Sequence, residues 1–284
     1  MSTADPTIPK DHWWECSPSY IKAYEDVAFL NRNELRPIRL QLELLKTELA
    51  LQEHNVRSTV VVFGGTRIAP PDEARKHLAE VEHRLTESPS DPHLQRELRI
   101  ARNILAKSKY YEEARAFGRL VSEAGQKGDG NEYVVVTGGG PGVMEAANRG
   151  AFESGAKSIG LNITLPHEQQ PNRYITPDLC FQFHYFAIRK MHFMLRAKAL
   201  VAFPGGYGTM DELFEALTLV QTHKVKRLPI VLMGQSFWQG VVNFERFVEE
   251  GVIAPEDTGL FHFAETAQEA WDYIRDFWRS NGTV

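Results

Sequence analysis

In the second half of the chain, short runs of apolar residues alternate with longer segments in which apolar residues recur every three or four positions. Runs of the first kind are typical of strands buried on both faces, and segments of the second kind are typical of amphipathic helices. We expect strands at residues 57–63, 132–137, 158–163, 180–183, 199–203, 228–233 and 261–263. We expect helices at residues 72–87, 93–125, 143–154, 186–198, 209–223, 236–249 and 266–279.

This alternation predicts an α/β protein with a Rossmann-like, doubly wound parallel sheet that carries helices on both faces. We assign residues 57–284 to this domain, which we expect to bind a nucleotide and to be catalytic. Residues 72–108, interrupted by Ser88-Pro89-Ser90-Asp91-Pro92, predict a helical hairpin inserted after the first strand.

The first 56 residues have a different pattern, and we assign them to an N-terminal helical extension. Ile38, Leu42, Leu45 and Leu49 recur at spacings of four, three and four, which places them on one face of a helix. Ser17-Pro18 favours the start of another helix. We expect two helices here, packed on the main domain or on another subunit.

The composition of the chain argues against several classes of function. The chain has 284 residues, 43% of them hydrophobic, and a net charge of -5, which argues against binding nucleic acid by charge attraction. Its two cysteines form no CxxC pair, which fits a reducing cytoplasm and offers no zinc site. There is no secretory signal and no apolar stretch of the ~20 residues that a membrane span needs. We expect a cytoplasmic protein with no nucleic-acid partner and no membrane association.

Three glycine turns follow three of the expected strands: Gly64-Gly65, Gly138 to Gly142, and Gly205-Gly206 with Gly208. In an open parallel sheet, the carboxyl ends of the strands share one edge, where ligands bind. A single turn of this kind is equally well explained by the steric needs of a tight connection. Three on one edge favour a nucleotide or another phosphorylated ligand.

The usual nucleotide signatures are missing. The chain has no GxxxxGK[ST], so it is not a P-loop ATPase. GGGPGVME lacks the spacing of the dinucleotide fingerprint, and the acidic residue expected after the next strand is also missing, which disfavours a dehydrogenase.

The segment PGGYGTMDE, from Pro204 to Glu212, is the most informative part of the chain. A glycine turn before a helix leaves free N–H groups at the positive end of the helix dipole, where a phosphate binds. Thr209 and Glu212 also have the spacing of a capping box, which is a purely structural motif. Either role, or both, is compatible with the sequence.

Arg189-Lys190 is the second candidate feature. The pair falls in the first turn of a helix, where the helix dipole does not favour a positive charge, so an anionic ligand nearby would explain it. Ordinary solvated charge is the alternative.

These motifs together resemble the Lonely Guy (LOG) family. PGGYGTMDE is similar to the PGGxGTxxE motif of that family, and Arg189-Lys190 has the family's spacing to Glu212. GGGPGVMEAANRGA resembles the second glycine motif, and FGGTR resembles the first. LPHEQQPN resembles a loop of larger bacterial members. The resemblance covers residues 57 to about 250.

The resemblance implies hydrolysis of the N-glycosidic bond of a nucleoside 5′-monophosphate, AMP or a cytokinin riboside monophosphate, to free base and ribose 5-phosphate. It also implies a homodimer or higher homo-oligomer. Such proteins are often labelled lysine decarboxylases, but a pyridoxal-phosphate enzyme needs a Schiff-base lysine and an acidic partner for the pyridine nitrogen, and no lysine here has that setting. We expect no cofactor and no metal.

On this basis we expect Arg189 and Glu212 to be catalytic. Glu212 would stabilise positive charge at the anomeric carbon or orient water, and Arg189 would clamp the phosphate or polarise the leaving base. The residues expected to bind the phosphate or the rest of the substrate are Gly205, Gly206, Gly208, Thr209, Lys190, Gly139, Gly140, Gly142, Met144, Glu145, Gly65, Arg67 and Thr218. Base preference is expected to lie in loop residues such as 166–174.

Two alternatives remain open at this point. One is a non-catalytic nucleotide-binding or molybdenum-cofactor carrier protein. The other is a nucleotide-sensing hydrolase that is controlled by an alarmone bound elsewhere.

Overall fold

The fold is described by a computed structural model for residue 14 and for residues 17–127, 130–164 and 170–282. The chain divides into two compact units, residues 1–46 and residues 47–284.

In the first unit, the short helix α1 (Val27–Leu30) is capped by Asp26, whose carboxylate accepts the N–H of Phe29 at 2.9 Å. The long helix α2 (Arg36–Glu53) begins in this unit and ends in the second. It is the helix predicted from the apolar stripe, whose four side chains remain 44–53% exposed. The helix start predicted at Ser17-Pro18 is instead a short 3-10 turn, Pro18–Tyr20, and a second such turn is Asn33–Leu35.

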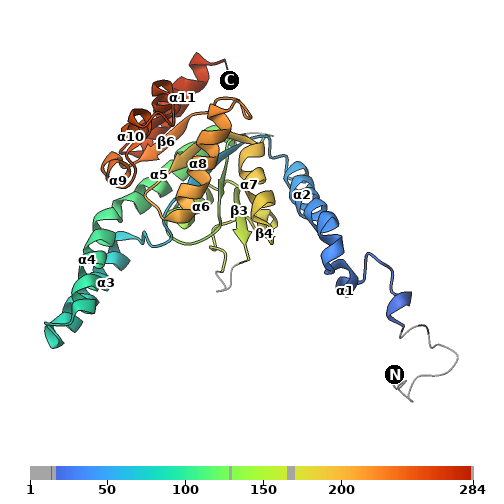
Figure 1. Ribbon diagram of the computed structural model, residues 1–284, viewed down its shortest axis with the longest axis horizontal. Helices are drawn as coiled ribbons and strands as arrows, with labels where there is room; N and C mark the ends of the chain where they lie inside the picture. The colour runs from blue at the N-terminus through green and yellow to red at the C-terminus, as the bar shows by residue number, and fades with distance from the viewer. Residues whose placement is uncertain (1–13, 15–16, 128–129, 165–169, 283–284) are drawn as a thin grey trace. The chain divides into compact units, whose positions relative to one another are not determined.

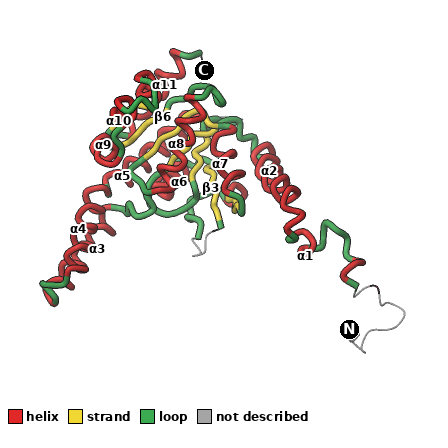
Figure 2. The backbone as a smooth tube through the Cα atoms, viewed as in Figure 1, coloured by secondary structure: helices red, strands yellow, loops and turns green. Residues whose placement is uncertain are grey.

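The second unit is built on one sheet of seven parallel strands in the order β4-β3-β2-β1-β5-β6-β7. Figure 2 shows the strands in yellow among the helices in red. The strands are β1 (Thr59–Phe63), β2 (Val134–Thr137), β3 (Ser158–Ile163), β4 (Cys180–Phe183), β5 (Ala197–Ala202), β6 (Ile230–Met233) and β7 (Phe261–Ala264). The predicted parallel α/β fold is therefore confirmed, with all seven expected strands present. β1 lies between β2 and β5, so the chain reverses its direction of growth across the sheet at this point.

Helices cover both faces of the sheet (Figure 1). They are α5 (Lys109–Gly125), α6 (Val143–Glu153), α7 (Phe186–Leu195), α8 (Tyr207–Gln221), α9 (Gln235–Val241), α10 (Phe244–Glu249) and α11 (Ala267–Ser280). The helices α3 (Pro71–Glu87) and α4 (Pro92–Lys107) do not belong to either core of the sheet. Alternate residues of the central strands enter two separate cores. Val60 and Val62 pack with α5, α6 and α11, whereas Val61 and Phe63 pack with α7, α8 and α9.

The structure corrects two of the predicted helices by dividing them. The segment 93–125 breaks at Ser108, whose hydroxyl donates to the carbonyl of Leu105 and so competes with the helical backbone. The segment 236–249 breaks at Asn243, whose side chain caps α10 by accepting the N–H of Arg246. The predicted hairpin is present as α3 and α4, which pack on each other and are joined by the Arg84–Glu97 and Arg102–Glu82 ion pairs.

None of the helices in the described ranges has both the length and the apolar character that crossing a membrane requires.

Candidate functional site

A cavity of about 350 Å³ opens at the carboxyl ends of β1, β2, β3 and β5. All three glycine turns contribute to its lining, so the prediction that they share one edge is confirmed. The predicted site residues that line the cavity are Gly65, Gly140, Met144, Arg189, Gly206, Gly208, Thr209 and Glu212.

The third turn presents free amides to this cavity. Gly206 is the N-cap of α8, and no side chain caps this end of the helix. The backbone N–H groups of Tyr207 and Gly208 make no hydrogen bond within the described part of the chain. Such groups at the positive end of a fifteen-residue helix form a site for a phosphate. Gly205 lies just outside the lining, and a Cβ there would come within 2.1 Å of the Thr209 hydroxyl.

The capping-box interpretation of Thr209 and Glu212 is wrong. α8 begins at Tyr207, so Thr209 is its third residue and Glu212 its sixth, beyond the reach of an N-cap contact. Glu212 is instead free to turn sideways into the cavity, where its carboxylate meets α7.

Arg189 and Glu212 form a buried ion pair between α7 and α8. Nη2 of Arg189 donates to Oε1 of Glu212 at 3.1 Å, and the two side chains are only 12% and 5% exposed. The guanidinium also lies 5.1 Å from the ring centroid of Phe186 and 5.6 Å from that of Phe193. Its Nε is buried and has no hydrogen-bond partner in the described structure. An unsatisfied cationic donor beside a cavity indicates that a ligand belongs there.

The carboxyl of Glu212 has a perturbed acidity. Burial raises its pKa above the ordinary value of 4.5, and the charges of Arg189 and Lys190 offset this effect only in part. Oε1 is held by Arg189, while Oε2 accepts no hydrogen bond from the described residues. The free oxygen is thus available to a group bound in the cavity.

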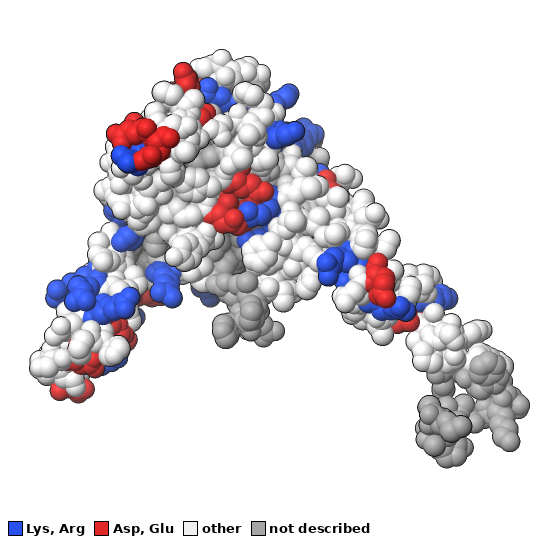
Figure 3. All heavy atoms as spheres, viewed as in Figure 1, with Lys and Arg blue, Asp and Glu red and all other residues white. Residues whose placement is uncertain are grey.

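Lys190, Thr218 and Arg67 are predicted site residues that lie outside the lining of the cavity. Lys190 turns the other way and pairs with Asp211 at 3.0 Å and with Glu215 at 2.9 Å. Figure 3 shows acidic and basic side chains gathered in the centre of this face of the molecule. Thr218 is exposed and donates to the carbonyl of Phe214, and Arg67 is exposed beside the first turn.

Other predicted residues shape the second turn without lining the cavity. Gly139 and Gly142 have positive φ values of 75° and 74°, so glycine is required at both. Gly142 is the N-cap of α6, and the N–H of Val143 is already donated to the carbonyl of Gly65. Glu145 accepts the hydroxyl of Tyr111 at 3.0 Å, and burial raises the pKa of Tyr111 to about 12, which keeps this hydroxyl a donor.

A buried polar network fixes the second turn, and the sequence analysis missed it. The amide nitrogen of Asn172 donates to the carbonyls of Gly139 and Gly140, both at 3.1 Å, and to the side chain of Asn148. Asn148 in turn accepts the hydroxyl of Thr137. An asparagine within the apolar face of α6 was the available signal. Of the loop 166–174, which was expected to set base preference, residues 166–169 lie outside the described residues.

Two further lining residues, Gly64 and Gly138, belong to the predicted glycine turns. Five others were not predicted: Phe63, Thr66, Asn162, Ile163 and Phe186. The apolar members extend the cores of β1 and β3 to the edge of the sheet. Asn162 differs from them, since it is a polar residue that follows the apolar Ile159 and Leu161 near the end of β3. Its position at a carboxyl end was the signal that could have found it.

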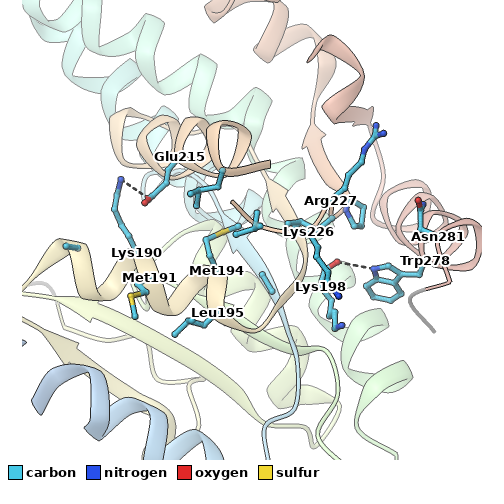
Figure 4. Close-up of a pocket in the computed structure, with 16 residues that line it drawn as sticks. Lys190, Met191, Met194, Leu195, Lys198, Glu215, Lys226, Arg227, Trp278 and Asn281 are labelled. Carbon is cyan, nitrogen blue, oxygen red and sulfur yellow. Dashed lines mark hydrogen bonds and ion pairs between the residues drawn. The ribbon is translucent and has the colours of Figure 1, made fainter. Parts of the chain in front are cut away.

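A larger cavity, of about 750 Å³, lies at the amino ends of β5 and β6 (Figure 4). Its lining includes Met191 and Met194 of α7, together with Lys198 and Trp278. The carboxylate of Glu215 in its wall is occupied by Lys190, as the dashed line in Figure 4 shows. No glycine turn contributes to its lining among the described residues, and its acidic residue, Glu215, is half-buried and paired to Lys190. The smaller cavity, which has the glycine turns and the more deeply buried Glu212, is therefore the candidate active site.

Comparisons with known proteins show which proteins the chain resembles. A family model described as "Possible lysine decarboxylase" matches residues 144–274, which include α7 and α8. The chain is 30% identical over 159 residues to the cytokinin riboside 5′-monophosphate phosphoribohydrolase LOG3 of Arabidopsis thaliana, covering 52% of this chain and 72% of that protein. It is 27% identical over 156 residues to the probable enzyme of the same kind LOGL3 of Oryza sativa, covering 51% and 68%.

Among solved structures, a molybdenum cofactor carrier protein from Chlamydomonas reinhardtii matches with a TM-score of 0.42 and 24% identity, covering 59% of this chain and 87% of the other. A molybdenum cofactor binding protein from Rippkaea orientalis matches with a TM-score of 0.42 and 20% identity, over the same shares. These scores are too low to support an argument about function.

Proposed function

We propose a function from one premise: the chain belongs to the Lonely Guy (LOG) family of cytokinin riboside 5′-monophosphate phosphoribohydrolases. The proposed reaction is hydrolysis of the N-glycosidic bond of a nucleoside 5′-monophosphate, AMP or a cytokinin riboside monophosphate, to free base and ribose 5-phosphate. The observation that carries the proposal is the buried Arg189–Glu212 pair beside the uncapped end of α8.

In this proposal, the free amides of α8 and the hydroxyl of Thr209 hold the 5′-phosphate. A fixed phosphate anchors the ribose, which places its anomeric carbon near the free oxygen of Glu212. The unpaired Nε of Arg189 supports binding of an anion from the side of α7.

The reaction requires that the bond between the anomeric carbon and the base nitrogen breaks and that water adds to the same carbon. Positive charge develops on the sugar as the base leaves with the bonding electrons, and the ionised carboxylate of Glu212 stabilises this charge. Water gives its oxygen to the anomeric carbon and one proton, in net terms, to the departing base. Arg189 keeps Glu212 oriented and favours its ionised form.

A non-catalytic carrier is less consistent with the same residues. Binding a phosphorylated ligand needs only the glycine turns and cations. A buried carboxylate near an anionic ligand weakens binding by charge repulsion, so its presence is better explained by a reaction that develops positive charge.

The first experiment incubates the purified protein with AMP and measures adenine by chromatography and ribose 5-phosphate by mass. We expect equal amounts of the two products. Adenosine, which lacks the anchoring phosphate, should react at least about 100-fold more slowly, since the phosphate supplies the positioning. AMP that stays intact while bound to the protein would exclude the hydrolase and favour a carrier.

We also propose that the chain self-associates through the outer face of α7 and α8. Tyr207, the first residue of α8, is 96% exposed and lies between two surface hollows of about 510 and 720 Å³. Phe186, Leu195 and Val241 are about half exposed as well. A projecting ring beside hollows on one surface suits a two-fold contact between identical subunits, because each copy supplies both parts.

Replacing Tyr207 with aspartate is therefore expected to convert the assembly to a monomer, because a charge would be buried without a partner. Light scattering coupled to size-exclusion chromatography measures the mass. The control is Phe152→Asp, which places the same charge at another exposed aromatic residue, on α6 at the other face of the sheet. An unchanged mass for Tyr207→Asp would show that this face does not mediate assembly.

A further inference from the structure

Asn162 stands at the end of the cavity that is farthest, in strand order, from α8. It is the next-to-last residue of β3 and the one carboxamide among the described residues that line the cavity. Its Nδ2 donates to the carbonyl of Phe181 at 3.0 Å and lies 3.5 Å from both the carbonyl of Gly160 and the sulfur of Cys180. These acceptors occupy the amide hydrogens, so they fix which way the carboxamide faces.

The oxygen of the same carboxamide is available. Oδ1 accepts no hydrogen bond from any residue in the described ranges. The carboxamide packs flat against the Cα of Gly139, where an added Cβ would come within 2.2 Å of Oδ1. The side chain, which belongs to the lining of the cavity, is therefore held in one position and keeps one unused acceptor.

The position of Asn162 relative to the phosphate site follows from the sheet. The cavity extends from the turn after β5, past β1 and β2, to β3. The proposed function puts the 5′-phosphate at the turn after β5. Three strand spacings amount to ~14 Å, a span comparable with an extended nucleoside monophosphate. The base would then reach β3, where Met144 and Ile163 supply apolar surface for a flat ring.

We propose that Asn162 recognises the base by accepting a hydrogen bond at Oδ1 from an exocyclic amino group. This inference rests on the proposed function and adds the residue that selects the base, since AMP and cytokinin riboside monophosphates both keep an N–H on the exocyclic nitrogen at position 6. A 6-oxopurine nucleotide presents an oxygen at the same place, so two acceptors face each other and the hydrogen bond is lost. A site that depends on a fixed polar partner discriminates strongly against the analogue that lacks it.

The test measures kcat/KM for AMP and for IMP, which differ in the group at position 6 of the purine ring. The unmodified protein should prefer AMP by about 10- to 100-fold, as expected when a buried polar group is left unpaired. Asn162→Ala should bring the two values to within a few-fold, through loss of activity on AMP and not on IMP. Asn162→Asp keeps an acceptor and should retain part of the preference.

The matched control is Gln182→Ala. Gln182 is the register neighbour of Asn162 on β4, but it is exposed, donates to Thr164 and does not line the cavity. Its removal should leave the preference unchanged.

The outcomes separate the two proposals. Equal activity on AMP and IMP in the unmodified protein, or a preference that survives in Asn162→Ala, would overturn the role of Asn162 and leave the hydrolase intact. Release of no base from either nucleotide would overturn the proposed function itself. The comparison of AMP with IMP in the unmodified protein decides the matter even if Asn162→Ala does not fold.

Discussion

Glu212→Gln is expected to lower the rate of adenine release from AMP by at least about 100-fold, the size of effect seen when one electrostatic contact to a transition state is removed. Glutamine keeps the volume of the side chain and can still accept a hydrogen bond from Arg189, so the fold should be retained. It loses the negative charge that stabilises the sugar cation. The loss should therefore appear in kcat, with little change in the binding of AMP.

The control for this change is Glu215→Gln. Glu215 lies on the same helix and is also paired to a cation, Lys190, but it does not line the candidate active site. The activity of Glu215→Gln on AMP should stay within a few-fold of that of the unmodified protein. Near-normal turnover in Glu212→Gln, with an unchanged melting temperature, would show that this carboxylate has no catalytic role.

Arg189→Ala is expected to lower kcat/KM for AMP by about 100-fold or more, because it removes a buried cation that holds Glu212 and faces the bound anion. Arg189→Lys should recover only part of the activity, since an ammonium cannot reproduce the planar fork of the guanidinium. Arg196→Ala is the control. Arg196 follows the same helix and is comparably buried, and its ion pair is to Glu48, outside the cavity.

The pH dependence of the reaction provides an independent check of this pair. Activity requires the ionised form of Glu212, so it should fall as the pH is lowered through the pKa of that carboxyl. Because burial raises this pKa, the acid limb should lie above pH 4.5. Arg189 lowers the pKa, so in Arg189→Ala the acid limb of the residual activity should move further up. A limb at or below pH 4.5 in the unmodified protein would contradict the assignment to Glu212.

The sheet was predictable because its central strands are short, continuous apolar runs, a pattern that is typical of strands buried on both faces. The strand starts were less predictable. The expected strand 199–203 begins at Ala197, because α7 ends one turn earlier than its apolar pattern suggests. The breaks at Ser108 and Asn243 depend on single side-chain hydrogen bonds that periodicity does not reveal.

The candidate site was predictable where glycine turns mark the carboxyl ends of strands. The direction of a long side chain was not. Arg189 and Lys190 are adjacent in sequence, yet the helix turns one toward Glu212 and the other toward Asp211 and Glu215. Successive helical residues differ by about 100° in direction, so only the position of α8 decides which of the two enters the cavity.

Asn162 and Asn172 were missed for a related reason. Asparagine is common in loops and at strand ends, and although Asn172 ends the segment LPHEQQPN, no spacing in the sequence shows which groups either residue contacts. Their roles depend on the carbonyls of Phe181, Gly139 and Gly140, which are distant in sequence and meet them only when β2, β3 and β4 pair. Such contacts are properties of the assembled sheet.

The central claim is that the cavity holds a nucleoside monophosphate with its anomeric carbon beside residue 212. A crystal structure of Glu212→Gln with AMP tests this claim most directly, because the weakened variant should retain the intact nucleotide. The account predicts the phosphate on the amides of Tyr207 and Gly208, the anomeric carbon in contact with the substituted side chain at position 212, and the adenine amino group at Asn162. A phosphate bound at a different turn, or a glycosidic bond turned away from residue 212, would contradict it.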